Sequence, residues 1–519
     1  MNPRSHRPGK AQDTGLRARK EGNEMYYVST RDKSLHYTPA QAIAQGLSRE
    51  GGLFLPQVMP RLGENALNEL KDLSYQQRAV SIMSLFLEQF TGAELDRSAA
   101  AAYGPAKFDT PAVAPLREVD ENTHCLELWH GPTCAFKDMA LQMLPHLLSL
   151  SLKKTGEQKT ACILVATSGD TGKAALEGFR DVDQTKILVF YPKDGVSEIQ
   201  QLQMATQEGE NVGVCAVIGN FDDAQTGVKK LFSDVQLREE LAGRGYFLSS
   251  ANSINWGRVL PQIVYYISAY CDLLRDGKIQ SGEAINICVP TGNFGNILAA
   301  FYAREMGLPV KKLICASNSN NVLTDFLTTG VYDRNRPFHN TISPSMDILI
   351  SSNLERLLYL LSGEDDALVA SYMEQLSKEG RYEVRADILE RIQSCFAAGY
   401  ADEAATKATI AAMKREHGYL IDTHTAVAFK VLSDYRKETG DETKTVVAST
   451  ASPFKFSDSV LSALGVDEQK QGVALLEQLA EVSGVAAPAP LAALGSKSVR
   501  FTEFGEKEQM KAVVNAFLK

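Results

Sequence analysis

The sequence predicts an α/β protein with two parallel-sheet α/β domains and a mostly helical N-terminal region. Six short apolar runs are rich in aliphatic and β-branched residues: 161–167, 186–192, 213–219, 285–290, 312–317 and 445–450. Such runs are typical of parallel strands buried on both faces. Segments of helical periodicity follow several of them, and this strand–loop–helix alternation indicates α/β domains. A chain of 519 residues is long enough for about three domain-sized units.

The N-terminal part differs from the rest in composition. Residues 1–24 are polar and basic with almost nothing apolar, so we expect a disordered leader there. Residues 25–105 form an N-terminal region, in which 37–100 is mostly helical because apolar residues recur at helical spacing.

The remaining chain divides into two expected domains. We expect a smaller α/β domain at 106–250 and a larger one at 251–519. Residues 484–497 are rich in proline and small residues, which predicts a linker. Residues 506–519 have helical periodicity and predict a closing helix.

Composition and charge argue against several classes of protein. The 44% hydrophobic and 23% charged residues are ordinary for a soluble globular chain, and the formal net charge of −9 disfavours nucleic acid or an anionic membrane as partner. No apolar stretch reaches the roughly 18 residues of a spanning helix. The eight cysteines are scattered without CxxC pairs or Cys/His clusters. We therefore expect no metal site and no disulfides, but free thiols in a reducing cytoplasm.

Two glycine-containing loops each follow a predicted strand and precede a predicted helix. They are the SGDTG loop at 168–172 and the TGNFGN loop at 291–296. Glycine lets the backbone approach a ligand closely, and a helix N-terminus offers free N–H groups that suit a carboxylate or phosphate. A plain turn remains the alternative at both loops. Neither loop fits the nucleotide motifs GxxxxGKS/T or GxGxxG with a following acid.

Two further segments carry candidate reactive groups. Lys137 in HGPTCAFKD stands at a predicted helix start, where a cation does not stabilise the helix dipole. It is a candidate for Schiff-base chemistry, although most lysines are simply solvated. The strand 445–450 ends in hydroxyl residues, including Thr450, that can bind a ligand nitrogen or merely finish the turn. The isolated histidines His130 and His424 are interpreted as structural.

Taken together and in this order, the HGPTCAFKD, SGDTG and GNFGN segments and the Thr450 segment resemble threonine synthases. These are pyridoxal-phosphate enzymes of the fold type shared with the tryptophan synthase β chain. The likeness includes residues 29–56, ANSINWGR at 251–258 and SSNLERLL at 351–358, so it covers the chain from about Met25. Glu50 and Ser452 depart from the residues often found at their positions, an Asp and a His.

The resemblance implies a role for each motif. Lys137 would be the catalytic lysine that joins pyridoxal 5'-phosphate covalently, and Thr450 would face the ring nitrogen. The cofactor phosphate would be held by Gly292, Asn293, Phe294, Gly295 and Asn296. The substrate would be bound by Ser168, Asp170, Thr171, Asn252, Ser253, Asn255 and Arg258. Arg258 is the candidate for the substrate phosphate, with a purely structural role as the alternative.

The implied reaction is the last step of threonine biosynthesis, from O-phospho-L-homoserine and water to L-threonine and phosphate. We expect a cytoplasmic monomer or homodimer with this small-molecule substrate. An alternative in the same class is a phospho-lyase that releases a 2-oxo acid, ammonia and phosphate. A cofactor-free binding protein is disfavoured by the intact Lys137, GNFGN and Thr450, and a nicotinamide dehydrogenase by the missing fingerprint.

Overall fold

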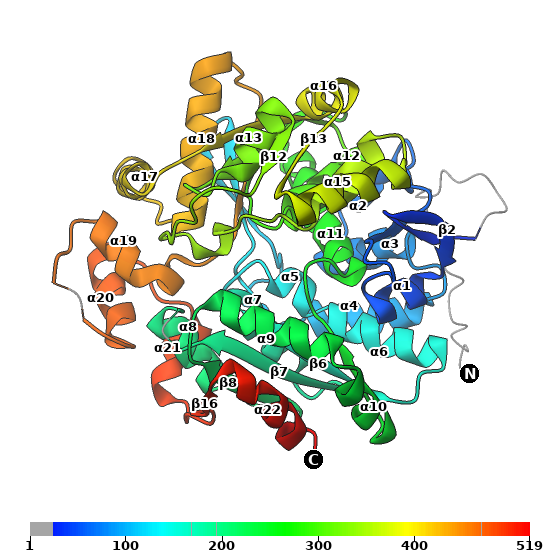
Figure 1. The fold of residues 1–519 in the computed structure, drawn as a ribbon. Helices are drawn as coiled ribbons and strands as arrows, with labels where there is room; N and C mark the ends of the chain where they lie inside the picture. The colour runs from blue at the N-terminus through cyan, green and yellow to red at the C-terminus, as the bar shows by residue number, and fades with distance from the viewer. Residues whose placement is uncertain (1–23, 168, 194, 469) are drawn as a thin grey trace, which may run out of the picture.

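Two nearly all-parallel sheets organise the computed structural model, which describes residues 24–167, 169–193, 195–468 and 470–519 (Figure 1). The larger sheet has the strand order β14 (Phe396–Tyr400), β11 (Val310–Ser317), β10 (Ile285–Pro290), β15 (Thr445–Ser449), β5 (Thr123–Glu127), β4 (Leu116–Asp120). The smaller has the order β16 (Phe504–Gly505), β8 (Val212–Val217), β7 (Thr185–Pro192), β6 (Thr160–Ala166), β9 (Tyr246–Ser249). Only β4 pairs antiparallel to its neighbour in these two sheets. All six predicted strands are present, which confirms the α/β fold class.

Helices cover both sheets. Those associated with the smaller sheet are α6 (Leu144–Thr155), α7 (Asp170–Phe179), α8 (Glu198–Ala205), α9 (Phe221–Ser233), α10 (Val235–Gly243) and α22 (Met510–Phe517). Those around the larger sheet include α11 (Trp256–Arg275), α12 (Gly295–Glu305), α13 (Val322–Thr329), α14 (Leu354–Leu361), α15 (Asp366–Lys378), α16 (Ala386–Cys395), α17 (Glu403–His417), α18 (Thr423–Thr439) and α19 (Ser457–Ala463). Among the described residues, no helix combines the length and apolar character that a membrane crossing requires.

The N-terminal region is helical with a small antiparallel sheet. The sheet is formed by β1 (Tyr27–Ser29), β2 (Asp32–Tyr37) and β3 (Phe54–Pro56), and the helices are α1 (Pro39–Gln45), α2 (Ala66–Leu70), α3 (Tyr75–Ser84) and α4 (Gly92–Tyr103). Thr38, Ser74 and Thr91 each begin a helix with a capping box, in which side chain and backbone satisfy each other's end groups. The helical prediction for 37–100 is therefore confirmed.

The sheets do not divide the chain at residue 250, where we expected the domain boundary. Strands β4 and β5 belong to the larger sheet although they lie within 106–250, because β5 pairs with β15 through Thr123 and Thr445. Strand β16 and helix α22 instead lie beside β8 and α9 of the smaller sheet (Figure 1). The local sequence pattern does not specify such distant pairings. The expected linker at 484–497 contains the short helix α21 (Ala489–Ala492), whereas the closing helix α22 is confirmed.

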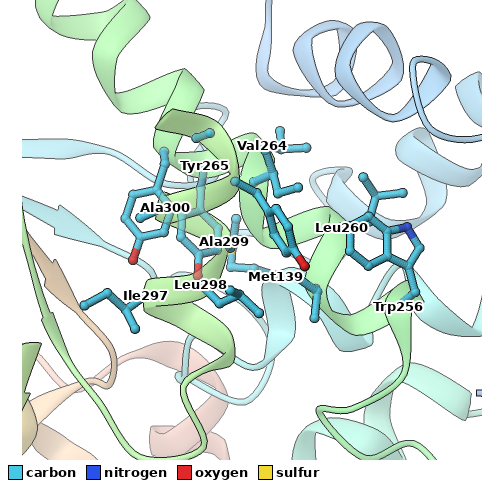
Figure 2. Close-up of a cluster of buried hydrophobic side chains, with 14 of the residues drawn as sticks. Met139, Trp256, Leu260, Val264, Tyr265, Ile297, Leu298, Ala299 and Ala300 are labelled. Carbon is cyan, nitrogen blue, oxygen red and sulfur yellow. The ribbon is translucent and has the colours of Figure 1, made fainter. Parts of the chain in front are cut away.

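Helices α11 and α12 pack against each other and share a cluster of buried hydrophobic side chains (Figure 2). Trp256, at the start of α11, is fully buried, and its ring lies 5.5 Å from that of Tyr27, 5.7 Å from Phe86 and 5.4 Å from Tyr302. Met139 of α5 (Asp138–Leu141) joins the same cluster. Burial of these large aromatic side chains anchors the start of α11 against α12 and the N-terminal region.

Candidate active site

Three neighbouring parallel strands end at one edge of the larger sheet, and each is followed by a predicted site segment. Strand β10 leads into TGNFGN, β15 into Thr450, and β5 into the segment that contains Lys137. The last two segments are joined by backbone bonds: Phe136 N–H donates to Thr450 O (2.8 Å) and Ser452 N–H to Cys134 O (3.0 Å). The fold therefore gathers the predicted groups where ligands of such sheets bind, beyond the carboxyl ends of the strands.

Lys137 is a half-buried amine in this position. Its Nζ donates to Ser345 Oγ (3.4 Å) and lies 5.1 Å from the centroid of the Phe136 ring. Burial lowers the pKa of Lys137 to about 8; the charge of Asp170 opposes this shift and that of Arg258 adds to it. A share of this amine is therefore neutral near pH 8, as a nucleophile or base must be.

Asp138, the residue after Lys137, holds the turn that precedes the lysine in place. Asp138 is fully buried and accepts hydrogen bonds from the backbone N–H and the hydroxyl of Thr133, both at 2.8 Å. Burial raises the pKa of Asp138 to about 6, partly offset by these bonds. These bonds from Thr133 to Asp138 close the turn before the lysine.

A buried ion pair joins the loops of the two sheets. Asp170, at the start of α7, lies 3.0 Å from Nζ of Lys455, which also donates to Thr133 O (2.8 Å) and Gln203 Oε1 (2.9 Å). Gln200 donates to the same carboxylate at 2.8 Å. Burial alone would raise the pKa of Asp170, but the neighbouring lysine charges hold it below its usual range. The site therefore lies between the two sheets.

The GNFGN loop forms a cradle at the start of α12. Phe294 adopts φ 62°, and a Cβ on Gly292 would lie 2.6 Å from the carbonyl oxygen of Ser345. The side-chain oxygen of the buried Asn296 accepts from the hydroxyls of Tyr265 and Tyr266, whereas its Nδ2 has no partner within the described chain. Free N–H groups at a helix start, with an unpartnered amide donor beside them, fit an anion such as a phosphate.

The buried charge of the site is positive overall. Arg258, in the first turn of α11, is 3% exposed; it donates to Ala251 O (2.5 Å), and its Nε has no partner among the described residues. Burial lowers the pKa of Arg258 to about 10. The charges of Arg258 and Lys455 both act on Lys137, Asp170 faces Lys137 and Lys455, and the buried Asp138 also faces Lys455. Such an excess of buried cations suits a second anionic ligand.

The other predicted substrate residues differ in their exposure and in their contacts. Thr171 lies partly exposed in the first turn of α7, and Asn252 is exposed, with its N–H donating to Ser250 Oγ (3.2 Å). Ser253 Oγ accepts from Asn353 Nδ2 (3.4 Å). The expected Ser168 and the leader up to residue 23 lie outside the described residues.

Asn255, an expected substrate residue, has a structural role at the start of α11. Its Oδ1 accepts from Gly257 N–H (2.8 Å) and caps α11, while its Nδ2 donates to Ile43 O (3.0 Å) in α1. The amide oxygen thus caps α11, and the amide nitrogen joins α11 to the N-terminal region. A motif match alone does not reveal either contact.

Several important residues escaped the sequence analysis. Fully buried Arg356 donates to Phe54 O (2.8 Å), Asn353 Oδ1 (2.5 Å) and Ile254 O (2.5 Å). Asn353 Nδ2 in turn donates to Asn293 O of the cradle (3.1 Å). The SSNLERLL segment therefore supports the cradle, and its recurrence in the family pattern was the available signal. Nothing in the sequence indicated Lys455 or Ser345.

Comparisons with known proteins agree with this geometry. Residues 26–103 match the family "Threonine synthase N terminus", residues 108–451 "Pyridoxal-phosphate dependent enzyme", and residues 425–514 "Threonine synthase, C-terminal". The threonine synthase of Eremothecium gossypii is 40% identical over 84% of this chain and 89% of its own length. Human threonine synthase-like 1 is 40% identical over 83% of this chain, but the match spans only 58% of that longer protein.

Solved structures show the same fold. The crystal structure of pyridoxal-phosphate-bound threonine synthase from Brucella melitensis superposes with a TM-score of 0.85 at 37% identity, covering 96% of this chain and all of that one. Yeast threonine synthase gives a TM-score of 0.85 at 34% identity over 95% of this chain and 98% of its own. The cofactor is pyridoxal phosphate, and the cradle, the unpartnered Asn296 amide and the amine of Lys137 fit it. The chain belongs to the threonine synthase family of pyridoxal-phosphate-dependent enzymes.

Proposed function

We propose that this protein is a threonine synthase, which converts O-phospho-L-homoserine and water into L-threonine and phosphate. The observation that carries the proposal is the excess of buried positive charge beside Lys137. The GNFGN cradle accounts for one phosphate, that of the cofactor. Arg258, with its unpartnered Nε, is available to a second anion, whereas Lys455 is already held by Asp170; a phosphorylated amino acid supplies such an anion.

Lys137 is the group that we assign to proton transfer. The chemistry supplied by bound pyridoxal phosphate is the withdrawal of electrons from the substrate's Cα. Lys137 takes the proton from that carbon, and its pKa of about 8 makes the neutral amine available near neutral pH. At the ordinary lysine pKa of 10.5, too small a fraction of the side chain would be neutral near pH 7 to act as this base.

The surrounding residues bind and orient. Arg258 presents a planar, charged fork to the substrate phosphate. This phosphate would leave from Cγ as a proton is lost from Cβ; Cγ would then take up a proton and water would add at Cβ. Thr450 offers a neutral hydroxyl to the ring nitrogen, which keeps that nitrogen less protonated than a carboxylate would. Asp170 balances part of the cationic charge and fixes the position of Lys455.

A phospho-lyase is the second candidate, since the threonine synthase-like 1 proteins match as closely as the threonine synthases do. Both activities release phosphate, but only the first retains the amino group in threonine. The purified holoenzyme should be incubated with O-phospho-L-homoserine, and phosphate, threonine, 2-oxobutyrate and ammonia measured. We expect one threonine per phosphate; one 2-oxobutyrate and one ammonia per phosphate would instead establish the phospho-lyase.

A further inference from the structure

Ser345 contacts three parts of the site at once. It lies in the 3₁₀ turn η1 (Pro344–Met346), and its hydroxyl accepts from Lys137 Nζ (3.4 Å). Its backbone N–H donates to Nε2 of His424 (3.1 Å), and its carbonyl oxygen lies over Gly292, 2.6 Å from where a Cβ would be. The segment around Ser345 is thus a wall of the site, between the amine and the phosphate cradle.

His424 is held in one orientation by Asp422. Both side chains are almost fully buried at the start of α18. His424 Nδ1 lies 2.8 Å from Asp422 Oδ2, and the carboxylate also accepts from the backbone N–H of His424 (2.9 Å) and that of Thr425 (3.1 Å). Because Nε2 accepts the N–H of Ser345, the ring proton belongs on Nδ1, facing Asp422.

The loop that carries Ser345 is also fixed on its far side. Asp347 accepts hydrogen bonds from the amides of Asn318 (2.7 Å) and Asn320 (2.9 Å) and from the backbone N–H of Thr341 (2.9 Å). This carboxylate, the Thr423 hydroxyl, 3.4 Å from Nδ1, and the ring of Phe456, 4.9 Å away, also face His424. The loop is therefore a rigid support, in which a single hydroxyl points to the amine.

We propose that Ser345 orients the Lys137 amine for its reaction, and that His424, fixed by Asp422, is the positioning residue that holds Ser345. A lysine side chain carries rotatable N–H donors on a flexible stem, so it needs an acceptor to keep one direction. A group misplaced by about 1 Å can lose roughly a hundredfold in rate. The inference rests on Lys137 being the reacting amine, and not on which product is released.

The first test compares Ser345→Ala with Ser345→Thr, which keeps the hydroxyl. Phosphate release by the holoenzyme is followed, so that the comparison is valid for either product. We expect Ser345→Ala to lower kcat by about tenfold to a hundredfold with KM almost unchanged, and Ser345→Thr to retain most of it. A second readout is the pH at which the visible absorption of the bound cofactor changes, which should shift in Ser345→Ala and not in Ser345→Thr.

The second test separates the two contacts of His424. His424→Gln places an amide oxygen near Nε2 and keeps the acceptor for Ser345, whereas His424→Asn keeps a donor to Asp422 but does not reach Ser345. We expect His424→Asn to resemble Ser345→Ala and His424→Gln to resemble the wild type. His417→Asn, at an exposed position at the end of α17, is the matched control and should have wild-type activity.

The double variant Ser345→Ala/His424→Asn decides whether His424 acts through Ser345. We expect it to be no slower than Ser345→Ala alone, because the two residues serve one contact. Losses that multiply would overturn the positioning role. Wild-type kcat and an unshifted absorption titration in Ser345→Ala would overturn the role of the hydroxyl, and this result does not depend on whether the His424 variants fold. Whether the product is threonine or 2-oxobutyrate tests only the proposed function and not the role of Ser345.

Discussion

Lys455→Met removes the charge that bridges the two sheets while keeping most of the length of the side chain. Lys455 is fully buried, and its Nζ has three contacts of 3.0 Å or less, with Asp170, Gln203 and the Thr133 carbonyl. In the variant, Asp170 stays buried with a hydrogen bond from Gln200 but without its nearest cation. Breaking a buried ion pair in this way costs about 3–5 kcal/mol.

The cost of this change should depend on pH. In the wild type, lysine charges hold the pKa of Asp170 below its usual range against the effect of burial. A lowered carboxyl pKa contributes stability that is present above the pKa of the unfolded chain and is lost as pH falls through the folded value. Without Lys455, burial raises the pKa of Asp170, so the carboxyl of the variant becomes neutral, and its penalty falls, at a higher pH than in the wild type. The difference between wild type and Lys455→Met should therefore be full at pH 7 and become smaller towards pH 4.

Urea unfolding of the cofactor-loaded protein, followed by circular dichroism at pH 7 and pH 4.5, measures this difference. Asp170→Asn/Lys455→Met, which removes both charges, should recover much of the loss. Lys378→Met is the control; its side chain is 71% exposed and pairs with an exposed glutamate, so the expected change is below about 0.5 kcal/mol. A Lys455→Met protein as stable as the control at pH 7 would refute the reasoning.

Three further changes test other parts of the site. Gly292→Ala should weaken cofactor retention on dialysis by tenfold or more, because its Cβ would lie 2.6 Å from the Ser345 carbonyl, whereas Gly243→Ala, with no atom within 4 Å, should have no effect. Arg258→Lys should raise KM for O-phospho-L-homoserine by roughly tenfold to a hundredfold in a steady-state assay, since a charged hydrogen bond contributes about 1.5–3 kcal/mol, and an unchanged KM would remove Arg258 from the phosphate site. Burial alone would lower the pKa of His130, but two neighbouring carboxylates raise it above its usual value. Its stabilisation is therefore present below about pH 6.5 and lost as pH rises through the folded pKa, so His130→Gln should lower the melting temperature at pH 6 more than at pH 9; equal losses would contradict this.

Much of the fold could be predicted because buried parallel strands have a local signature. The run 285–290 matches β10 residue for residue, since a continuous aliphatic run needs no partner to be recognised. Strand β5, with the sequence THCLE, has no such run and is a strand because β15 pairs with it, more than 300 residues further along the chain. For the same reason, the two sheets do not divide the chain at residue 250.

The candidate site could be predicted as far as its ligand-binding loops. Glycines and a helix start indicate an anion cradle by local chemistry, and the family pattern adds Lys137 and Thr450. The supporting residues could not be found in this way. Ser345 and His424 act through a contact between distant segments, and Asn255 lies in a family motif but caps a helix. Such roles depend on three-dimensional neighbours that neither periodicity nor spacing specifies.

Borohydride reduction of the holoenzyme, followed by peptide mapping, tests the central claim most directly. Reduction fixes the bond between the cofactor aldehyde and the lysine amine that holds it. The account predicts that the cofactor mass lies on the peptide containing Lys137 and is absent from that peptide in Lys137→Arg. Cofactor mass on another lysine, with the buried Lys455 the nearest alternative, would contradict the assignment on which the proposed function and the role of Ser345 both rest.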